Sequence, residues 1–176
     1  QSNEGRAFVY LGSGTGPSTS PAWTAESDQN DARFGVSVAT AGDVNGDGYS
    51  DVIVGSYLYD NGQTEEGRGF VYLGSGAGLS TNAAWTAESN QSDARFGCSV
   101  ATAGDVNGDG YSDVIVGALF HDNGQTDEGR AFVYLGSGAG LSTSAAWTAE
   151  SDQNGAYFGY SVATAGDVNG DGYSDV

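Results

Sequence analysis

The sequence repeats itself with a fixed period of 62 residues. Asp43, Asp105 and Asp167 follow one another at this interval. The same interval separates the three tryptophans, Trp23, Trp85 and Trp147. A period of this size predicts a repeat architecture, in which each unit buries its apolar surface against its neighbours. The copies are nearly identical, so sameness between them does not mark functional residues.

Four short apolar runs, separated by glycine-rich turns, make up each repeat. The first complete set covers residues 36–41, 51–57, 68–73 and 84–88. Val, Ile, Tyr, Phe and Trp dominate these runs, and the Asn-Gly step at 61–62 is a strong tight-turn signal. No stretch between glycines is long enough to sustain a helical period. We therefore expect an all-β protein with four strands in each repeat.

We expect these strands to form tandem four-stranded antiparallel blades of a β-propeller. Runs such as "FVYL" are apolar on both faces, which indicates sheets packed between neighbouring sheets. A β-solenoid is the alternative, but its coils are usually much shorter than this repeat. The sequence holds about three blades, and a propeller needs four to eight. Further repeats or self-association would close the array, and an open array is the other possibility.

The expected repeats are 1–62, 63–124 and 125–176. The first starts at the third strand of a blade, and the last is truncated within the second strand of the next blade. Terminal repeats normally differ from the others in order to cap the stack, and neither end differs here. We therefore expect an excerpt from a longer array, or a chain that associates with copies of itself.

The chain is strongly acidic. It has 23 Asp and Glu against 5 Lys and Arg, which gives a formal net charge of −18. Nucleic acids and anionic membranes favour basic partners, so neither is expected to bind. The longest apolar stretch, residues 114–120, is far shorter than the roughly 20 residues of a membrane-spanning helix. With 38% apolar residues the chain can bury a core, so the acidity predicts bound cations rather than disorder.

One acidic segment, "DVNGDGYSD", occurs in every repeat, beside an apolar run. Side-chain oxygens at positions 1, 3, 5 and 9, with a backbone carbonyl at position 7, can surround one hard cation. Glycine at position 6 permits the sharp turn. The start matches an EF-hand loop, but position 12 is Val54 rather than Glu. The alternative is an acidic turn without metal, although three adjacent carboxylates would then repel one another by a few kcal/mol per pair.

The all-oxygen donor set favours Ca²⁺ over Mg²⁺, which keeps its waters, and over zinc, which prefers His or Cys. We predict one Ca²⁺ in each repeat and three in the chain. The predicted ligands are Asp43, Asn45, Asp47, Tyr49 (carbonyl) and Asp51; Asp105, Asn107, Asp109, Tyr111 and Asp113; and Asp167, Asn169, Asp171, Tyr173 and Asp175.

The segments "RFGVSVATAGDVNGDGYSDVIVGS" and "RFGCSVATAGDVNGDGYSDVIVGA" resemble FG-GAP repeats, the blades of the integrin α-subunit propeller and of many bacterial surface proteins. The carriers, besides the acidic loops, are Phe34-Gly35, Phe96-Gly97, Phe158-Gly159, Val54-Gly55 and Val116-Gly117. The "GAP" part departs from the family pattern, because it reads "GSY" and "GAL" here. The resemblance implies four-stranded blades with calcium in the loop that joins the first two strands, held by the same ligand positions.

Nothing in the sequence favours an enzyme. Lysine is absent, and His121, the one histidine, has no Cys or Ser partner nearby and is interpreted as a surface turn residue. Cys98 is alone and is expected to pack as a small apolar residue. Asn90 begins a single glycosylation sequon. The tryptophans are interpreted as core between blades rather than as sugar-stacking platforms.

We therefore expect a calcium-stabilised FG-GAP repeat protein at the cell surface or outside the cell, with a structural or adhesive role in a longer array or filament. Its partners would be further repeats or copies of itself. The alternative is a lectin-like or receptor-type module that binds an extracellular protein or a glycan, using residues that vary between repeats near one turn. These residues are Tyr57, Tyr59, Leu119, Phe120 and His121.

Overall fold

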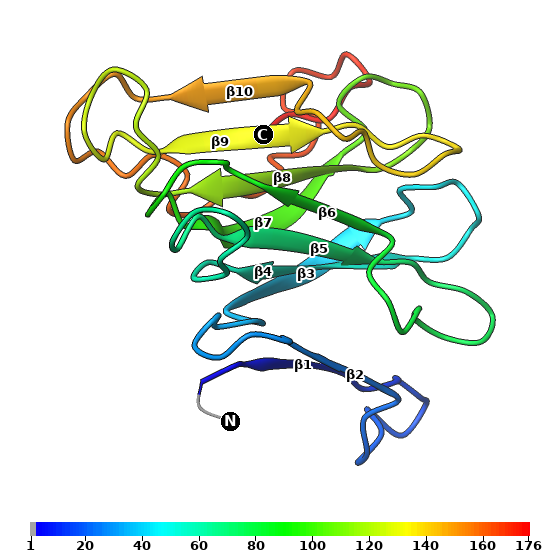
Figure 1. Cartoon of the computed structure of the whole chain (residues 1–176). Helices are drawn as coiled ribbons and strands as arrows, with labels where there is room; N and C mark the ends of the chain where they lie inside the picture. Colours follow the sequence, from blue (N-terminus) through cyan, green and yellow to red (C-terminus); the bar gives the residue numbers. More distant parts are fainter. Residues whose placement is uncertain (1–2) are drawn as a thin grey trace.

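The computed structural model describes residues 3–176, and its strands form three antiparallel sheets that stack along the molecule (Figure 1). The first sheet pairs β1 (Arg6–Val9) with β2 (Trp23–Glu26). The second has the order β3 (Ser37–Gly42), β4 (Asp51–Ser56), β5 (Arg68–Tyr72) and β6 (Trp85–Glu88). The third has the order β7 (Phe96–Gly104), β8 (Asp113–Ala118), β9 (Arg130–Tyr134) and β10 (Trp147–Glu150).

This architecture confirms the predicted fold class. The four runs expected at 36–41, 51–57, 68–73 and 84–88 are β3 to β6, with ends that differ by one residue. Consecutive strands pair as antiparallel neighbours, so each sheet is an up-and-down blade. The blades form an open stack, and among the described residues no helix is long and apolar enough to cross a membrane.

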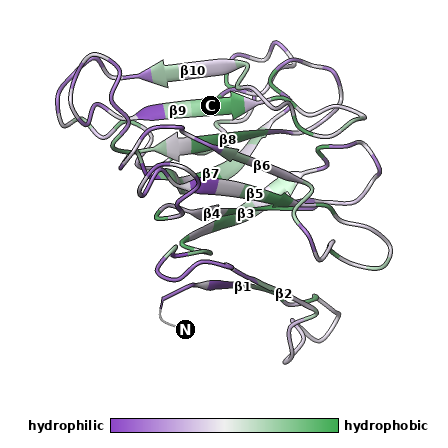
Figure 2. Cartoon of the chain, in the orientation of Figure 1, coloured by the Kyte–Doolittle hydropathy of each residue, from purple (hydrophilic) through white to green (hydrophobic). Residues whose placement is uncertain are grey.

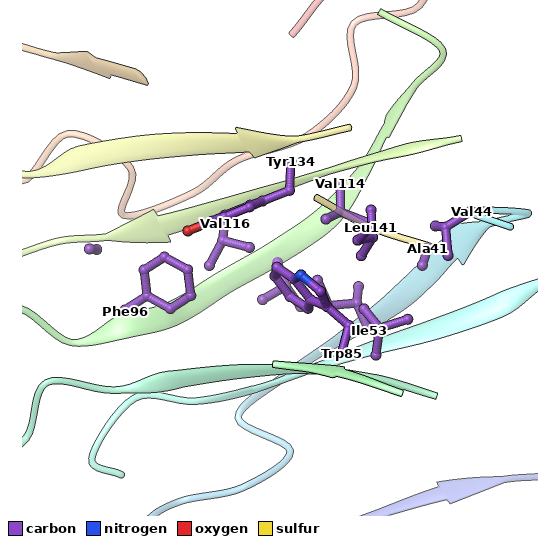
Figure 3. Close-up of a cluster of buried hydrophobic side chains, with 12 residues drawn as sticks. Ala41, Val44, Ile53, Trp85, Phe96, Val114, Val116, Tyr134 and Leu141 are labelled. Atoms are coloured by element: carbon purple, nitrogen blue, oxygen red, sulfur yellow. The ribbon is translucent and has the colours of Figure 1, made fainter. Parts of the chain in front are cut away.

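The main core lies between the two four-stranded blades. Trp85 of β6 lies across the junction, where its ring makes a T-shaped contact with Tyr134 at a centroid distance of 4.9 Å. The indole N–H donates to the carbonyl of Ser142 at 2.9 Å. Phe96 and Val116 complete the cluster from the second blade, and both are fully buried (Figure 3). The interpretation of the tryptophans as core between blades is therefore confirmed for Trp85.

The hydropathy of the residues differs between the strands and the connecting loops (Figure 2). Apolar residues concentrate in the strands, whereas the connecting loops are mostly polar. β8 is buried along its whole length, because the preceding blade packs on one of its faces and residues of the segment 158–176 pack on the other. A strand buried on both faces loses the polar–apolar alternation of a half-exposed sheet, which explains its continuous "VIVGA" run.

Glycines set the spacing between blades. A Cβ added to Gly55 would lie 2.0 Å from the carbonyl oxygen of Gly97, and one added to Gly117 would lie 1.9 Å from that of Gly159. The backbones of consecutive blades therefore meet without an intervening side chain. The Phe-Gly and Val-Gly pairs that mark the sequence are the two sides of this contact.

Residues 158–176 begin another unit. Their pairing is reduced to the antiparallel bridge between Gly166 and Asp175 and the parallel bridge between Gly129 and Phe158. Tyr160 and Val168 are 71% and 72% exposed. The acidic loop in this segment nevertheless keeps the internal hydrogen bonds of the loops in the complete blades.

Candidate metal-binding loops

In each four-stranded sheet, the acidic segment is the loop between the first and second strands. The third acidic segment is closed by the isolated bridge between Gly166 and Asp175. The loop that joins β3 to β4 begins at a bulge, where the register shifts between Thr40 and Gly42. Gly46 and Gly48 then take φ values of 74° and 88°. These left-handed conformations strain any residue with a Cβ, so the glycine expected at position 6 of the loop is confirmed as a turn requirement.

Asp43, at position 1, organises the loop backbone. Its Oδ1 accepts the N–H groups of Gly46 at 2.7 Å and Asp47 at 3.0 Å, and its Oδ2 accepts that of Gly48 at 2.8 Å. The equivalent Asp167 accepts the N–H groups of Gly170, Asp171 and Gly172 in the same way. These bonds, the one from Gly172 first, hold the pKa of Asp167 below its ordinary range because they favour the charged form.

The ligands predicted at positions 3 and 5 lie on the exposed side of the loop. Asn45 donates from Nδ2 to Oδ2 of Asp47 at 3.1 Å. The other oxygen of Asp47 accepts the N–H of Tyr49 at 2.9 Å. Asp47 is solvent-exposed and the side chain of Tyr49 is 48% exposed. Changes at Asp47 therefore leave the core of the blade intact.

Asp51, at position 9, is fully buried and joins three strands. Its Oδ2 accepts the N–H of Val44 at 2.9 Å, and its Oδ1 accepts that of Gly74, beyond the end of β5, at 2.8 Å. Burial raises the pKa of Asp51, and the charges of Asp47 and Asp43 raise it further, against the effect of the two backbone bonds. In the next blade, Asp113 accepts the equivalent N–H groups of Val106 and Gly136, and its pKa is raised for the same reasons.

Loops of consecutive blades touch one another. The N–H of Ser112 donates to the carbonyl of Asp43 at 2.9 Å, and the N–H of Asp43 donates back to Oγ of Ser112 at 3.1 Å. The ring of Tyr111 packs over Gly46, where a Cβ would lie 2.5 Å from the ring. The sequence alone does not reveal this role of Ser112, because in near-identical repeats a repeated serine carries no signal of its own.

The five predicted ligands of each repeat thus lie in one loop, but hydrogen bonds within the loop engage most of their oxygens. In residues 3–176, three acidic side chains have ligand atoms that all lie within 4.8 Å of one another, and they are Glu128, Glu150 and Asp152 rather than the loop aspartates. The donor set of the loop still fits a hard cation. Every donor is an oxygen, a carboxylate has further lone pairs, and the charges at Asp43 and Asp47 act on the buried Asp51.

Stacked four-stranded antiparallel sheets, with an acidic loop between the first two strands of each, define a class of repeat protein built from propeller-type blades. The FG-GAP repeat model matches residues 34–73, 96–134 and 158–176. The chain belongs to the FG-GAP repeat family.

Integrin α-subunits are similar to this chain over most of its length. It is 35% identical to integrin alpha-IIb of Mus musculus over 156 residues. This aligned region covers 85% of the chain and 15% of the relative. The chain is 32% identical over 178 residues to integrin alpha-7 of Rattus norvegicus, covering 100% of the chain and 15% of the relative. For integrin alpha-4 of Xenopus laevis the identity is 36% over 149 residues, covering 81% and 14%. The chain thus spans about 15% of these relatives.

The sequence also led to expectations for three residues outside the acidic loops, Cys98, Asn90 and His121. Cys98 is half-buried as expected, and burial raises the pKa of its thiol to about 11. Asn90 is exposed, and its glycosylation stays a prediction. The interpretation of His121 as a surface residue is wrong, because the side chain is 8% exposed. Its ring packs edge-on against Phe132, with centroids 5.6 Å apart.

Proposed function

We propose that this chain is a calcium-stabilised FG-GAP repeat module of the cell exterior, with a structural or adhesive role and without enzymatic activity. One Ca²⁺ in each loop would be held by the side chains at positions 1, 3, 5 and 9 and the carbonyl at position 7. The observation that carries the proposal is the fully buried carboxylate of Asp51, on which the charges of two further loop aspartates act. A divalent cation offsets this repulsion, and millimolar external calcium is enough to fill weak sites.

The proposed mechanism is linkage between ion binding and folding. The loop residues order the turn, and Asp51 ties it to the end of β5 through Gly74. Asp43 ties the same turn to the next blade through Ser112. An ion that neutralises the loop therefore stabilises the contact between blades as well as the turn. Three such ions would change the formal charge from −18 to −12.

The proposal of a structural role is supported by exposed apolar side chains on the blades, which a further stacked blade would cover. Val38 of β3 is 56% exposed and Trp147 of β10 is 45% exposed, although the equivalent Trp85 is buried between blades. Further repeats, or copies of this chain, would bury such faces as the blade after β6 buries Trp85. We propose a longer array or a filament-like assembly on this ground. Integrin-like relatives favour an adhesive setting at the cell surface.

Calcium counting by equilibrium dialysis tests the loop assignment. Asp47→Ala should lower the number of bound ions by one, because Asp47 is an exposed ligand whose loss leaves the blade folded. Asp93→Asn is the matched control, since it removes one exposed negative charge outside the loops and keeps a residue that tolerates the φ of 63° there. An unchanged ion count in Asp47→Ala contradicts the assignment.

A second candidate function is supported by a groove of about 490 Å³ between the blades. Tyr57, Phe120 and Tyr160 line it, together with the guanidinium of Arg95, which lies 5.2 Å from the ring centre of Phe120. Aromatic rings beside hydrogen-bonding groups suit a glycan or a peptide. Binding on a glycan array that Tyr160→Ala abolishes would support this lectin-like alternative. Assembly without any ligand would support the structural role.

A further inference from the structure

A second acidic cluster lies outside the calcium loops, at the far end of the last complete blade. Glu128 lies two residues before β9, Glu150 ends β10, and Asp152 lies two residues after it. One ligand atom from each of the three lies within 4.8 Å of the other two. Two oxygens that bind one Ca²⁺ at about 2.4 Å are at most about 4.8 Å apart, so the cluster has the dimensions of a coordination sphere.

Glu128 supplies an independent sign of a ligand. Its side chain is fully buried, and its Oε1 accepts the N–H of Asn123. Its Oε2 is also buried and has no hydrogen-bond partner. A buried carboxylate oxygen without a hydrogen-bond partner costs free energy, because it loses its hydration and gains no other bond. Such atoms are rare in proteins unless water or an ion contacts them.

Glu150 repeats this pattern. Its Oε1 accepts Nδ2 of Asn123 at 2.7 Å, whereas its Oε2 is buried and has no hydrogen bond. Nε of Arg130 lies 3.4 Å from this Oε2 as an ion pair. Three carboxylates and one guanidinium leave a formal charge of −2, which matches one divalent cation. The exposed Asp152 leaves the cluster open to solvent.

The cluster is separate from the calcium loops. β8 and β9 are antiparallel, so the start of β9 lies beside the end of β8. Arg130 pairs with Ala118, and Tyr134 pairs with Val114, near the start of β8. Because a strand rises about 3.3 Å per residue, the cluster lies about 17 Å from the buried Asp113. In Figure 1, β9 begins and β10 ends at the left of the blade, whereas β8 begins at the right, where its acidic loop lies.

The preceding repeat offers a natural comparison. Glu66 corresponds to Glu128, is fully buried, and also has a buried Oε2 without a partner. Asn90 stands where the last repeat has Asp152. Of the two four-stranded blades, only the last therefore carries the third carboxylate. The first repeat also has an aspartate at this position, Asp28, whose Oδ1 accepts the hydroxyl of Tyr59 at 3.1 Å. Asn90 and Asp152 have φ values of 56° and 57°, so their backbones are equivalent and glycine is compatible with both.

We propose that Glu128, Glu150 and Asp152 bind a divalent cation, and that Ca²⁺ fits this site best. The donors are all oxygens, and three carboxylates with an open side suit an ion that accepts irregular coordination and added water. The site would clamp the turn before β9 to the end of β10. It would thus close the end of the blade opposite to the loop.

The test counts Ca²⁺ bound to the whole chain at about 1 mM free ion, by equilibrium dialysis and elemental analysis. Asp152→Gly should bind one ion fewer than the parent chain. Asn90→Gly, which makes the same backbone change without removing a carboxylate, should bind the same number as the parent. Circular dichroism checks that both variants fold, which the exposed positions favour.

An equal count in Asp152→Gly and the parent chain overturns the proposal, as does an equal loss in both variants. This comparison does not depend on the loops. If the loops bind no calcium, all the counts fall together, and the difference between Asp152→Gly and Asn90→Gly remains one ion. Loss at Asp47→Ala without loss at Asp152→Gly would support the loop sites and refute the second site.

Discussion

Ser112 and Asp43, 69 residues apart in the chain, exchange two hydrogen bonds between the loops of consecutive blades. One bond uses the Ser112 hydroxyl, and the other uses only backbone atoms. The acidic loops are therefore not isolated turns. The first loop is supported by the second, and the same exchange recurs between Asp105 of the second loop and Ser174 of the third.

Ser112→Ala should destabilise the chain by about 1 kcal/mol, because the part-buried N–H of Asp43 loses its acceptor. Ser50 is the matched control: it occupies the same position of the first loop and is exposed. Ser50→Ala should therefore leave stability within about 0.5 kcal/mol of the parent. Urea denaturation midpoints measure both. Equal effects of the two changes would mean that the hydroxyl of Ser112 does not join the blades.

Gly55→Ala should destabilise the chain by at least about 3 kcal/mol, or prevent folding, because the new Cβ would lie 2.0 Å from the carbonyl oxygen of Gly97. Backbone on both sides of the contact leaves no flexible side chain to move away. Gly14→Ala is the control, since a Cβ there meets nothing within 4 Å. Thermal unfolding compares the two. A Gly55→Ala chain as stable as the parent would show that the blades separate easily.

The strands and the loop turn could be predicted from the sequence because both depend on local signals. Apolar runs bounded by glycine predicted β3 to β6 to within one residue at each end. The glycine at position 6 of the loop indicated the left-handed backbone conformation that the structure has there. The assignment of calcium ligands stays a prediction, since it concerns an ion rather than the chain.

The contacts between repeats could not be predicted in the same way. The hydroxyl of Ser112 and the second carboxylate oxygen of Asp51 meet groups on another loop or strand, and near-identical repeats give no contrast that would mark them. The burial of His121 could not be predicted for a related reason. This residue sits in a turn, which favours exposure, but Phe132 of the neighbouring strand covers its ring.

His121 should make stability depend on pH. Burial, and then the charge of Arg130, lower the pKa of His121 below its ordinary value of 6.5. The folded state therefore favours neutral imidazole, while the unfolded chain takes up a proton below pH 6.5. Stability from this group is fully present above pH 6.5 and is lost as pH falls toward the folded pKa, by at most about 1.4 kcal/mol per pH unit.

His121→Tyr is the matched variant, because Tyr59 fills this position in the preceding repeat. The difference in unfolding free energy between the parent and His121→Tyr should shift against the parent as pH falls from 7 to 5. Urea denaturation at intervals across this range measures it, with the calcium concentration held constant. A difference that does not vary with pH would mean that the imidazole titrates as it does in water.

Removal of calcium should lower the midpoint of thermal unfolding. Each loop ion that binds only the folded chain contributes about 2.7 kcal/mol when the free ion is 100 times its dissociation constant, and this contribution disappears in a chelator. Calorimetry of metal-free protein, titrated with Ca²⁺ at constant ionic strength, measures the shift. Mg²⁺ at the same concentration is the control, and it should stabilise less because it dehydrates reluctantly. Equal stabilisation by the two ions would point to simple screening of the negative charge, since screening does not distinguish them.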